Sequence, residues 1–255
     1  MGVVNITPDS FSDGGRFLDA NAAIAHARTL AEEGADIIDI GGESTRPGAA
    51  AVSESEELAR VIPVLEKIGD LCVSIDTRRP AVMRAALQAG ASMVNDVQAL
   101  QAPGAIEAVR ENKCAVCLMH MKGDPATMQR EPHYDDVVRE VKEFLSARLR
   151  AAEGAGIAHD RLVVDPGFGF GKTAEHNLTL LAHLDEFRDI GAPLLAGLSR
   201  KSTLGKLTGR PVAERLAGSL TMALLALQGG ATILRVHDVK ETRDVIAVWE
   251  AVGAA

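Results

Sequence analysis

A glycine near a helix end, followed by a short apolar run, recurs along the chain and constrains the fold more than any other feature. Three copies are clearest: Ala31–Ala35 leads into Ile37–Gly41, Leu87–Ala91 leads into Met93–Asp96, and Leu227–Ala231 leads into Ile233–His237. Glycine suits the left-handed residue that ends a helix. A continuous apolar run of this length suits a parallel strand that is buried on both faces. The repeat therefore predicts helices that alternate with parallel strands.

The whole chain divides into eight such strand-then-helix units. Strands are expected at Gly2–Asn5, Ile37–Ile40, Cys72–Asp76, Met93–Asn95, Ala115–Met119, Leu162–Asp165, Leu194–Leu198 and Ile233–Val236. Helices are expected at Asn21–Glu33, Ser53–Ile68, Pro80–Gln88, Pro103–Asn112, Asp135–Glu153, Ala174–Arg188, Val212–Gln228 and Lys240–Val252. Eight units without a break in composition predict a TIM (β/α)8 barrel of the α/β class, as a single domain over residues 1–255. A doubly wound open sheet is the alternative.

Local signals support several of these helix starts. Ser53 with Glu56 has the pattern of a capping box. Pro80 and Pro103 suit the first turn of a helix, where a missing N–H costs nothing. These signals predict where three of the helices begin.

Polar residues follow the apolar part of nearly every expected strand. They are Asn5, Asp39, Asp76, Asn95, Asp165, Ser199–Lys201, Arg235 and His237. In a barrel the carboxyl ends of the strands meet on one face, and active sites of barrel enzymes lie there. At Asp165 a β-branched run ends on a carboxylate, and Pro166 then prevents further ladder bonding. The sequence therefore predicts a pocket at this face with Asp165 at its rim.

Composition excludes several classes of partner. Of the 255 residues 47% are hydrophobic and 24% are charged, and the net charge is -8, which disfavours nucleic-acid and anionic-membrane partners. Neither an apolar run of membrane-spanning length nor a signal segment is present. Three cysteines, an odd number, fit a reducing compartment. A cytoplasmic enzyme is predicted.

Two familiar motifs are considered and rejected. Cys114 and Cys117 have the spacing of a redox or zinc motif, but on a buried strand residues three apart face opposite ways, about 10 Å apart. Gly167–Thr173 resembles a phosphate-binding loop, but that loop needs glycine at position 166, where the chain has Pro166. The glycines also lack the Rossmann spacing. A disulfide and a nucleotide site are therefore both disfavoured.

Seven stretches, taken in order, resemble dihydropteroate synthase. They are the loops 5–15 and 41–48, which are rich in Gly, Ser, Thr and Pro, then Ser74–Thr77, Asn95–Asp96, Asp165–Phe170, Gly197–Ser202 and Arg235–His237. This family joins p-aminobenzoate to dihydropterin hydroxymethyl diphosphate, and gives dihydropteroate and pyrophosphate in folate biosynthesis. The resemblance spans nearly the whole chain and implies this activity.

The resemblance also implies roles for individual residues. The pterin site is similar to the family's at Asp76, Asn95, Met119, Asp165 and Lys201, and a carboxylate can accept two adjacent pterin N–H groups. For these acids, buried helix capping or ion pairing with Arg78 or Arg200 is the structural alternative.

The second implied site receives the diphosphate. It contains Asn5, Arg235 and His237, with Mg²⁺ bound through the Asn5 oxygen. Arg235 and His237 are two apart on the expected strand, so their side chains are predicted to point the same way and to form a cationic receptor.

The third implied site holds p-aminobenzoate, near Thr45, Arg46, Pro47, Phe170 and Ser202, where Ser199–Ser202 is expected to open a helix. The catalytic residues implied are Asp76, Lys201, Arg235 and His237. The reaction expected is a dissociative substitution, in which pyrophosphate leaves and the neutral aromatic amine then attacks the pterin cation.

Other functions remain open from the sequence. A Schiff-base aldolase using Lys201 would be another barrel enzyme. A pterin-dependent methyltransferase barrel shares pterin-binding acids, and a non-catalytic pterin-binding homologue would keep the site without turnover. The family resemblance further implies a homodimer and inhibition by sulfonamides as aminobenzoate mimics.

Overall fold

The computed structural model describes residues 1–6, 16–44, 52–124 and 127–254. Its strands are β1 (Gly2–Asn5), β2 (Ile38–Gly41), β3 (Val73–Asp76), β4 (Met93–Asp96), β5 (Ala115–Met119), β6 (Leu162–Asp165), β7 (Leu195–Ala196) and β8 (Ile233–Leu234). Its α-helices are α1 (Arg16–Glu32), α2 (Glu54–Leu65), α3 (Pro80–Gln88), α4 (Ala105–Arg110), α5 (Val137–Gly154), α6 (Ala174–Ala182), α7 (Ser202–Thr208), α8 (Leu216–Gln228) and α9 (Val239–Gly253). Short 3₁₀ helices span His159–Arg161, Leu184–Ile190 and Val212–Glu214.

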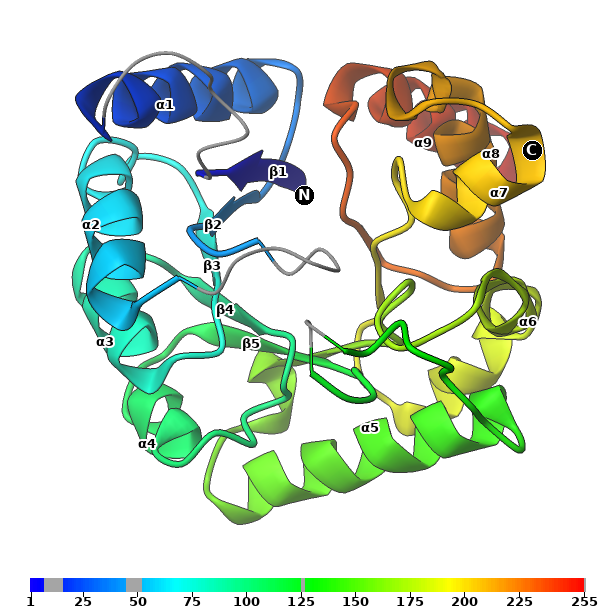
Figure 1. The fold of residues 1–255 in the computed structure, drawn as a ribbon, viewed down its shortest axis with the longest axis horizontal. Coiled ribbons are helices and arrows are strands. Elements are labelled where there is room, and N and C mark those ends of the chain that lie inside the picture. The colour runs from blue at the N-terminus through cyan, green and yellow to red at the C-terminus, as the bar shows by residue number, and fades with distance from the viewer. Residues whose placement is uncertain (7–15, 45–51, 125–126, 255) are drawn as a thin grey trace.

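The strands close into a parallel barrel. Strands β1 to β6 pair in chain order, and β7 pairs with β8. A bridge from Val164 to Leu194 joins β6 to β7, and a bridge from Gly2 to Val236 joins β8 back to β1. At that junction Val3 N donates to the Val236 oxygen at 3.1 Å. Figure 1 shows the helices as a ring around the strands, so the predicted (β/α)8 barrel is confirmed and the open sheet is wrong.

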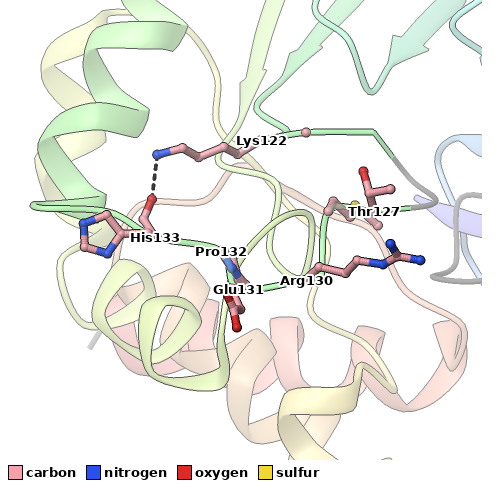
Figure 2. Close-up of a pocket in the computed structure, with 8 residues that line it drawn as sticks. Lys122, Thr127, Arg130, Glu131, Pro132 and His133 are labelled. Carbon is pink, nitrogen blue, oxygen red and sulfur yellow. Dashed lines mark hydrogen bonds between the residues drawn. The ribbon is translucent and has the colours of Figure 1, made fainter.

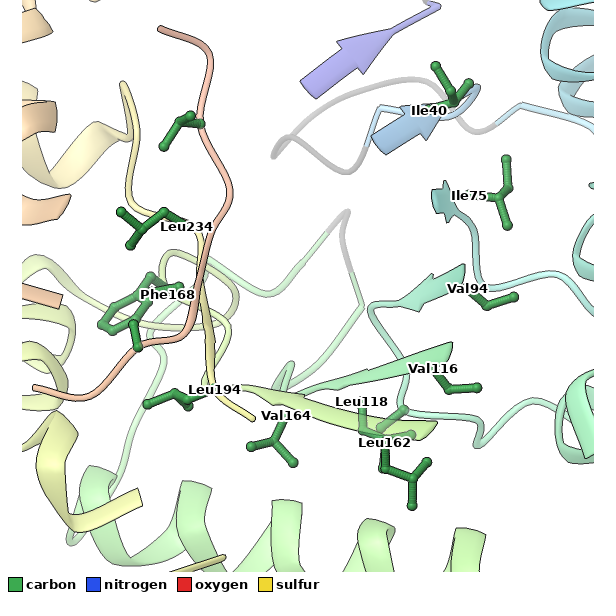
Figure 3. Packing of buried hydrophobic residues seen from close by; sticks show 14 of the residues in the cluster. Ile40, Ile75, Val94, Val116, Leu118, Leu162, Val164, Phe168, Leu194 and Leu234 are labelled. Atoms are coloured by element: carbon green, nitrogen blue, oxygen red, sulfur yellow. The ribbon is translucent and has the colours of Figure 1, made fainter. Parts of the chain in front are cut away.

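The alternation of side chains along each strand separates two cores. Outward-facing residues such as Ile40, Val94 and Val164 pack between the strands and the helices, as Figure 3 shows. Inward-facing Met93, Cys117, Val163 and Leu195 form a smaller cluster inside the barrel, which we call the apolar plug. Because side chains alternate in and out with a period of two, the next inward residues toward the carboxyl ends lie above this plug.

The register of the strands sets which polar residues meet there. Asn5 pairs with Gly41, Gly41 with Asp76, and Asp76 with Asn95. Asp165 lies two residues after Val163 of the plug on β6. The barrel mouth is therefore lined by the polar strand ends that the sequence singles out.

Several predicted boundaries are wrong at helix starts. Helix α4 begins at Ala105 rather than Pro103, because Gly104 takes a left-handed conformation (φ 85°) and ends the preceding turn. The Ser53 side chain caps α2 by accepting from Glu56 N at 3.2 Å. The Glu56 carboxylate instead binds Arg60 at 2.5 Å, so only half of the capping box forms. Pro80 does begin α3.

Two expected helices are interrupted. The segment predicted as Ala174–Arg188 ends as an α-helix at Ala182 and continues as the 3₁₀ helix Leu184–Ile190. In the segment predicted as Val212–Gln228, the α-helix begins only at Leu216. Strands β7 and β8 are also shorter than predicted, because only two residue pairs stay in register between them.

Two further sequence expectations concern the described part of the chain as a whole. Cys114, just before β5, is buried beneath the helices, and Cys117 of β5 is buried in the plug. Both thiols are free, as the sequence predicts from their opposite orientation. Within the described ranges, no helix is both long and apolar enough to cross a membrane. That residues 1–255 form one domain stays a prediction.

Candidate functional site

One half of the barrel mouth is an ion-paired network, which we call the Arg235 cluster: Asp39 and Asn95, which are buried, and Asp76 and Arg235, which are partly buried. Arg235 Nε donates to Asp39 Oδ2 at 2.6 Å, and its Nη2 donates to Asp76 Oδ2 at 2.7 Å. The Asn95 amide nitrogen donates to the same Asp39 oxygen at 3.2 Å. Residues from β2, β3, β4 and the end of β8 thus meet over the plug.

The electrostatics of this network follow from its burial. Asp39 is fully buried. Burial raises the pKa of Asp76 to about 7, although the Arg235 guanidinium opposes the shift. The two carboxylates more than offset the cost of burying Arg235, whose pKa lies above its usual value. The sequence predicts a cationic receptor here, but the two acids offset the positive charge of Arg235.

The Arg235 cluster retains unpaired acceptors. Asn95 Oδ1 and Asp39 Oδ1 are buried and have no hydrogen-bond partner among the described residues. Because the Asn95 nitrogen is committed to Asp39, the Asn95 oxygen is left as an acceptor for a ligand. Buried polar atoms are normally paired, so these atoms indicate a place where N–H or O–H donors bind.

The other half of the mouth is the Lys172 cluster: His120, Asp165, Lys172 and Lys201. Asp165 Oδ1 accepts from Gly167 N at 2.7 Å. Burial raises the pKa of Asp165, while Lys201, Lys172 and Arg235 all oppose the shift. Burial lowers the pKa of Lys201 to about 8. Its ammonium donates to the Phe168 oxygen and lies 4.8 Å from the centre of the Phe170 ring.

The two clusters adjoin at Gly197. A β-carbon at this glycine would lie 3.8 Å from both the Lys201 nitrogen and the Arg235 β-carbon. The pKa of Arg235 is also raised by Asp165. The predicted acids and cations therefore converge on one mouth. Arg78 and Arg200, the alternative partners considered for the acids, instead bind Glu43 and Asp238.

Other residues singled out by the sequence lie around these clusters. His237 contacts Ser199 Oγ through both its backbone nitrogen, at 3.2 Å, and its Nδ1, at 3.1 Å. Met119 is buried at the end of β5. Ser202 begins α7, as expected from its position after a strand. Thr45, Arg46 and Pro47 lie outside the described residues, as does most of the loop 5–15.

Sequence reasoning gave no role to three buried polar residues of the site. Asp39 is among the polar strand ends that the sequence analysis identifies, because a carboxylate interrupts the apolar run Ile37–Ile40. His120 and Lys172 gave a weaker signal, since each follows a strand within a loop.

Asp96, next to Asn95, points outward and accepts from the backbone nitrogens of Gln98 and Leu100, both at 2.8 Å. Asp96 thus shapes the turn after β4.

A separate cavity lies on the loop that follows β5. It measures about 380 Å³ and is lined by residues of the segment 122–133, which Figure 2 shows, including Lys122, Arg130 and His133. Lys122 donates to the His133 oxygen at 2.6 Å across it. None of its lining residues belongs to the Arg235 cluster or the Lys172 cluster.

The chain is similar to proteins of known family over almost its whole length. The family model described as "Pterin binding enzyme" matches residues 1–237. Dihydropteroate synthase of Escherichia coli (strain K12) is 51% identical over 258 residues, which cover 100% of this chain and 92% of that protein. A structure of the Xanthomonas albilineans dihydropteroate synthase with 4-aminobenzoic acid superposes with a TM-score of 0.95 at 57% identity, over 100% of this chain and 92% of that one. The Xanthomonas albilineans enzyme in complex with 7,8-dihydropteroate gives 0.91 at 54% identity, over 100% and 93%.

Proposed function

The chain belongs to the pterin binding enzyme family and, within it, to the dihydropteroate synthases, and from this premise we propose how its two clusters divide the reaction. The chain is a transferase of folate biosynthesis. It joins 6-hydroxymethyl-7,8-dihydropterin diphosphate to p-aminobenzoate and releases pyrophosphate and 7,8-dihydropteroate.

The observation that carries the proposal is the set of buried acceptors at the mouth. Asp165 and Asp76 offer carboxylate oxygens, and Asn95 Oδ1 is buried without a partner among the described residues. The amino-pyrimidinone edge of a pterin presents adjacent N–H donors that match such acceptors. Lys201, beside Asp165, offers N–H donors to the pterin carbonyl and ring nitrogen. We propose that the pterin lies flat above the apolar plug with Met119 at its face.

The diphosphate is proposed to lie toward the end of β8. A guanidinium has five N–H donors, and Nε and Nη2 of Arg235 are engaged by Asp39 and Asp76. The Nη1 edge can donate to phosphate oxygens. Since the two acids offset the charge of Arg235, His237 and Lys201 are proposed to supply much of the net positive potential.

The surroundings of Asn5 fit a magnesium ion held mainly by substrate. A β-carbon at Gly41 would lie 3.7 Å from Asn5 Oδ1 and 3.6 Å from the Asp76 β-carbon, so glycine leaves this space open. Among the described residues no group of three or more His, Cys, Asp or Glu could hold a metal. Mg²⁺ commonly takes phosphate oxygens, waters and one or two protein oxygens. When bound, Mg²⁺ neutralises charge on the leaving phosphates, and Asn5 would hold it.

A dissociative substitution suits these side chains. The bond from the pterin methylene to the diphosphate breaks first, and Asp76 lies where it can stabilise the pterin cation. The amine of p-aminobenzoate, unprotonated at neutral pH, then attacks this carbon, and the new secondary amine loses one proton to solvent. We propose that Phe170 packs against its ring, that Ser202 lies near its carboxylate, and that Thr45, Arg46 and Pro47 complete the site. This route requires no base–nucleophile pair.

A coupled assay of pyrophosphate release tests the function. The chain is mixed with dihydropterin diphosphate, p-aminobenzoate and Mg²⁺, and dihydropteroate is followed by chromatography. Turnover is expected only with both substrates, and chelation of Mg²⁺ is expected to reduce it, chiefly by raising the KM for the diphosphate substrate. A sulfonamide should compete with p-aminobenzoate. Pterin binding without pyrophosphate release would favour a non-catalytic homologue.

A homodimer through α8 and α9 is a further proposal. Leu216 and Leu225 of α8, and Val248, Trp249 and Val252 of α9, are exposed large apolar side chains on helices that pack against each other. Exposed apolar patches of this kind mark association surfaces. Light scattering should give a dimer that Val248→Asp with Leu225→Asp converts to a monomer, whereas Leu178→Asp on α6 should not. A monomeric parent chain would contradict this proposal.

The cellular compartment is proposed to be the cytoplasm. Cys72, Cys114 and Cys117 all carry free thiols. Free thiols fit a reducing compartment.

A further inference from the structure

Lys172 follows the glycine-rich stretch after β6. Because that stretch is not a phosphate-binding loop, the sequence assigns no role to this lysine. The side chain is 98% buried, with 2% of its surface exposed. Its ammonium donates to His120 Nδ1 at 2.9 Å, to the Gly167 oxygen at 2.9 Å and to the Phe170 oxygen at 3.1 Å. The His120 oxygen lies at 3.4 Å. One side chain therefore joins the loop after β5 to the loop after β6.

The acceptors around Lys172 are unusual for a buried cation. Buried ammonium groups are generally paired with a carboxylate, yet no carboxylate within hydrogen-bonding distance of Lys172 is found among the described residues. Burial lowers its pKa, and Asp165 opposes the shift. Burial and the nearby Lys172 lower the pKa of His120 to about 2, so its imidazole is neutral and Nδ1 can accept. The cost of this arrangement suggests a function beyond packing.

The two loops touch so closely that their positions are interdependent. A β-carbon at Gly167 (φ 69°) would lie 1.9 Å from the His120 oxygen, and one at Gly171 (φ 62°) would lie 2.2 Å from the Lys122 oxygen. The Tyr134 hydroxyl donates to the Gly171 oxygen at 2.9 Å. Only glycine fits both places, so the loops form one frame with the Lys172 ammonium inside it.

We propose that Lys172 is a positioning residue, whose ammonium fixes this frame and so sets the Asp165 carboxylate for the pterin and the Phe170 ring for p-aminobenzoate. The inference rests on the proposed function. Gly167 provides the link to Asp165, since its oxygen accepts from Lys172 while its nitrogen donates to Asp165 Oδ1 at 2.7 Å. Phe170 is held through its own oxygen, and its ring lies next to Lys201.

Electrostatics gives Lys172 a second effect on the same carboxylate. Lys201, Lys172, Arg235 and the Gly167 N–H all favour the ionised form of Asp165 against burial. Loss of the Lys172 cation therefore raises the pKa of Asp165 further. The acidic limb of kcat/KM for the pterin substrate moves to higher pH, because this parameter reports groups of the free enzyme.

The first test compares Lys172→Met with Lys122→Met. The backbone of Lys122 belongs to the frame, but its side chain lies outside. Its ammonium lies 4.1 Å from the centre of the Tyr134 ring and donates to the His133 oxygen, as Figure 2 shows, and to the Glu140 carboxylate. Lys172→Met is expected to raise the KM for dihydropterin diphosphate about 30- to 100-fold, as misplacement of a binding group by about 1 Å does. The acidic limb of kcat/KM of this variant for the pterin substrate should shift to higher pH. Lys122→Met should change KM by less than about twofold and leave the limb in place.

The second test removes one acceptor without opening the frame. His120→Phe keeps a ring against Phe144, whose centre lies 4.9 Å from that of His120, but removes Nδ1. His120→Asn removes the ring and keeps an acceptor near the Nδ1 position. The phenylalanine variant should raise the KM for the pterin substrate several-fold, and the asparagine variant should recover most of that loss. If Lys172→Met does not fold, this pair of His120 variants tests the positioning role of Lys172 in its place.

The outcomes separate positioning from packing. A folded Lys172→Met variant with a lower Tm but unchanged KM values and pH limb would overturn the proposal. So would His120→Phe with an unchanged KM for the pterin substrate. The parent chain is assayed first, so a parent without pyrophosphate release refutes the proposed function separately. Pterin affinity measured by calorimetry on the same variants then still decides the role of Lys172.

Discussion

The Arg235 cluster and the Lys172 cluster bury cations side by side in opposite ways. Arg235 is bound by two carboxylates that come from β2 and β3. Lys172 is bound by backbone oxygens and a neutral imidazole from two loops. The first arrangement neutralises charge between side chains. In the second arrangement the Lys172 ammonium binds the backbone of the loops after β5 and β6. Asp165 lies close to both Lys172 and Lys201.

This difference suggests a division of labour at the mouth. The Arg235 cluster sets two acids against one guanidinium and keeps unpaired acceptors, so it can receive a neutral heterocycle and direct only part of the guanidinium at phosphate. The Lys172 cluster surrounds one buried carboxyl group, Asp165, with cations that oppose the rise in its pKa caused by burial. Mutations should therefore act through charge balance in the first region and through backbone position in the second.

The largest effect is expected at Asp165. Asp165→Ala removes the buried carboxylate proposed to accept from the pterin N–H groups, and truncation of such a hydrogen-bonded charge costs about 2–5 kcal/mol of binding free energy, or a factor of roughly 30 to 5,000 in pterin affinity. Calorimetry with a pterin and the pyrophosphate assay measure this loss. Asp165→Asn, which keeps the shape, should lose less. Near-normal turnover by the alanine variant would contradict the assignment.

Removal of Arg235 should expose how the first cluster balances its charge. Arg235→Met leaves Asp39 and Asp76 buried without a cation and should lower the free energy of unfolding by about 3–5 kcal/mol. A second change, Asp39→Asn, should restore about 1–2 kcal/mol, because one uncompensated charge is removed. Urea unfolding of the two single variants and the double variant measures the coupling. Additive losses would show that the carboxylates do not depend on Arg235.

The charge of Lys201 should set an alkaline limit. Burial lowers its pKa to about 8, so the ammonium is present below that pH and is lost above it. The kcat/KM for dihydropterin diphosphate should therefore fall about tenfold per pH unit above pH 8. Lys201→Arg, which stays protonated, should lose this limb even if its activity is lower. A flat profile to pH 9.5 in the parent chain would rule out a required Lys201 charge.

The smallest effect is expected next to His237. Ser199→Ala removes the hydroxyl that contacts both the His237 nitrogen and its Nδ1. A single hydrogen bond contributes about 0.5–1.5 kcal/mol, so the KM for the diphosphate substrate should rise by roughly fivefold with a small change in Tm. Ser92→Ala, at the opposite end of the barrel, serves as the control. A rise of KM for p-aminobenzoate alone would mean that His237 serves the other substrate.

The sequence predicts the first cluster better than the second, and the reason is physical. Asp76, Asn95 and Arg235 stand at strand ends, where alternation fixes the inward direction and the barrel fixes the neighbours. The pairing of Arg235 with Asp39 and Asp76 could not be predicted, since it depends on the stagger between β8 and β2. Strand position alone therefore predicts which side chains meet, but it does not predict which of them pair with each other.

Lys172 shows the limit of such reasoning. Besides His120 Nδ1, its acceptors are backbone oxygens of His120, Gly167 and Phe170, which every residue possesses and which leave no trace in residue type. Only the path of the two loops brings them together. The glycines at 167 and 171 stand in the sequence, but the segment that they approach cannot be identified from it.

The apolar plug below the mouth has a consequence for the order of events. The interior of the barrel below the mouth is filled by Met93, Cys117, Val163 and Leu195. Substrates therefore enter the site only from the carboxyl ends of the strands. Under the proposed arrangement the heterocycle at the bottom must arrive before the aminobenzoate that covers it. Pyrophosphate must depart past the incoming amine, and dihydropteroate, whose pterin end lies deepest, must leave last.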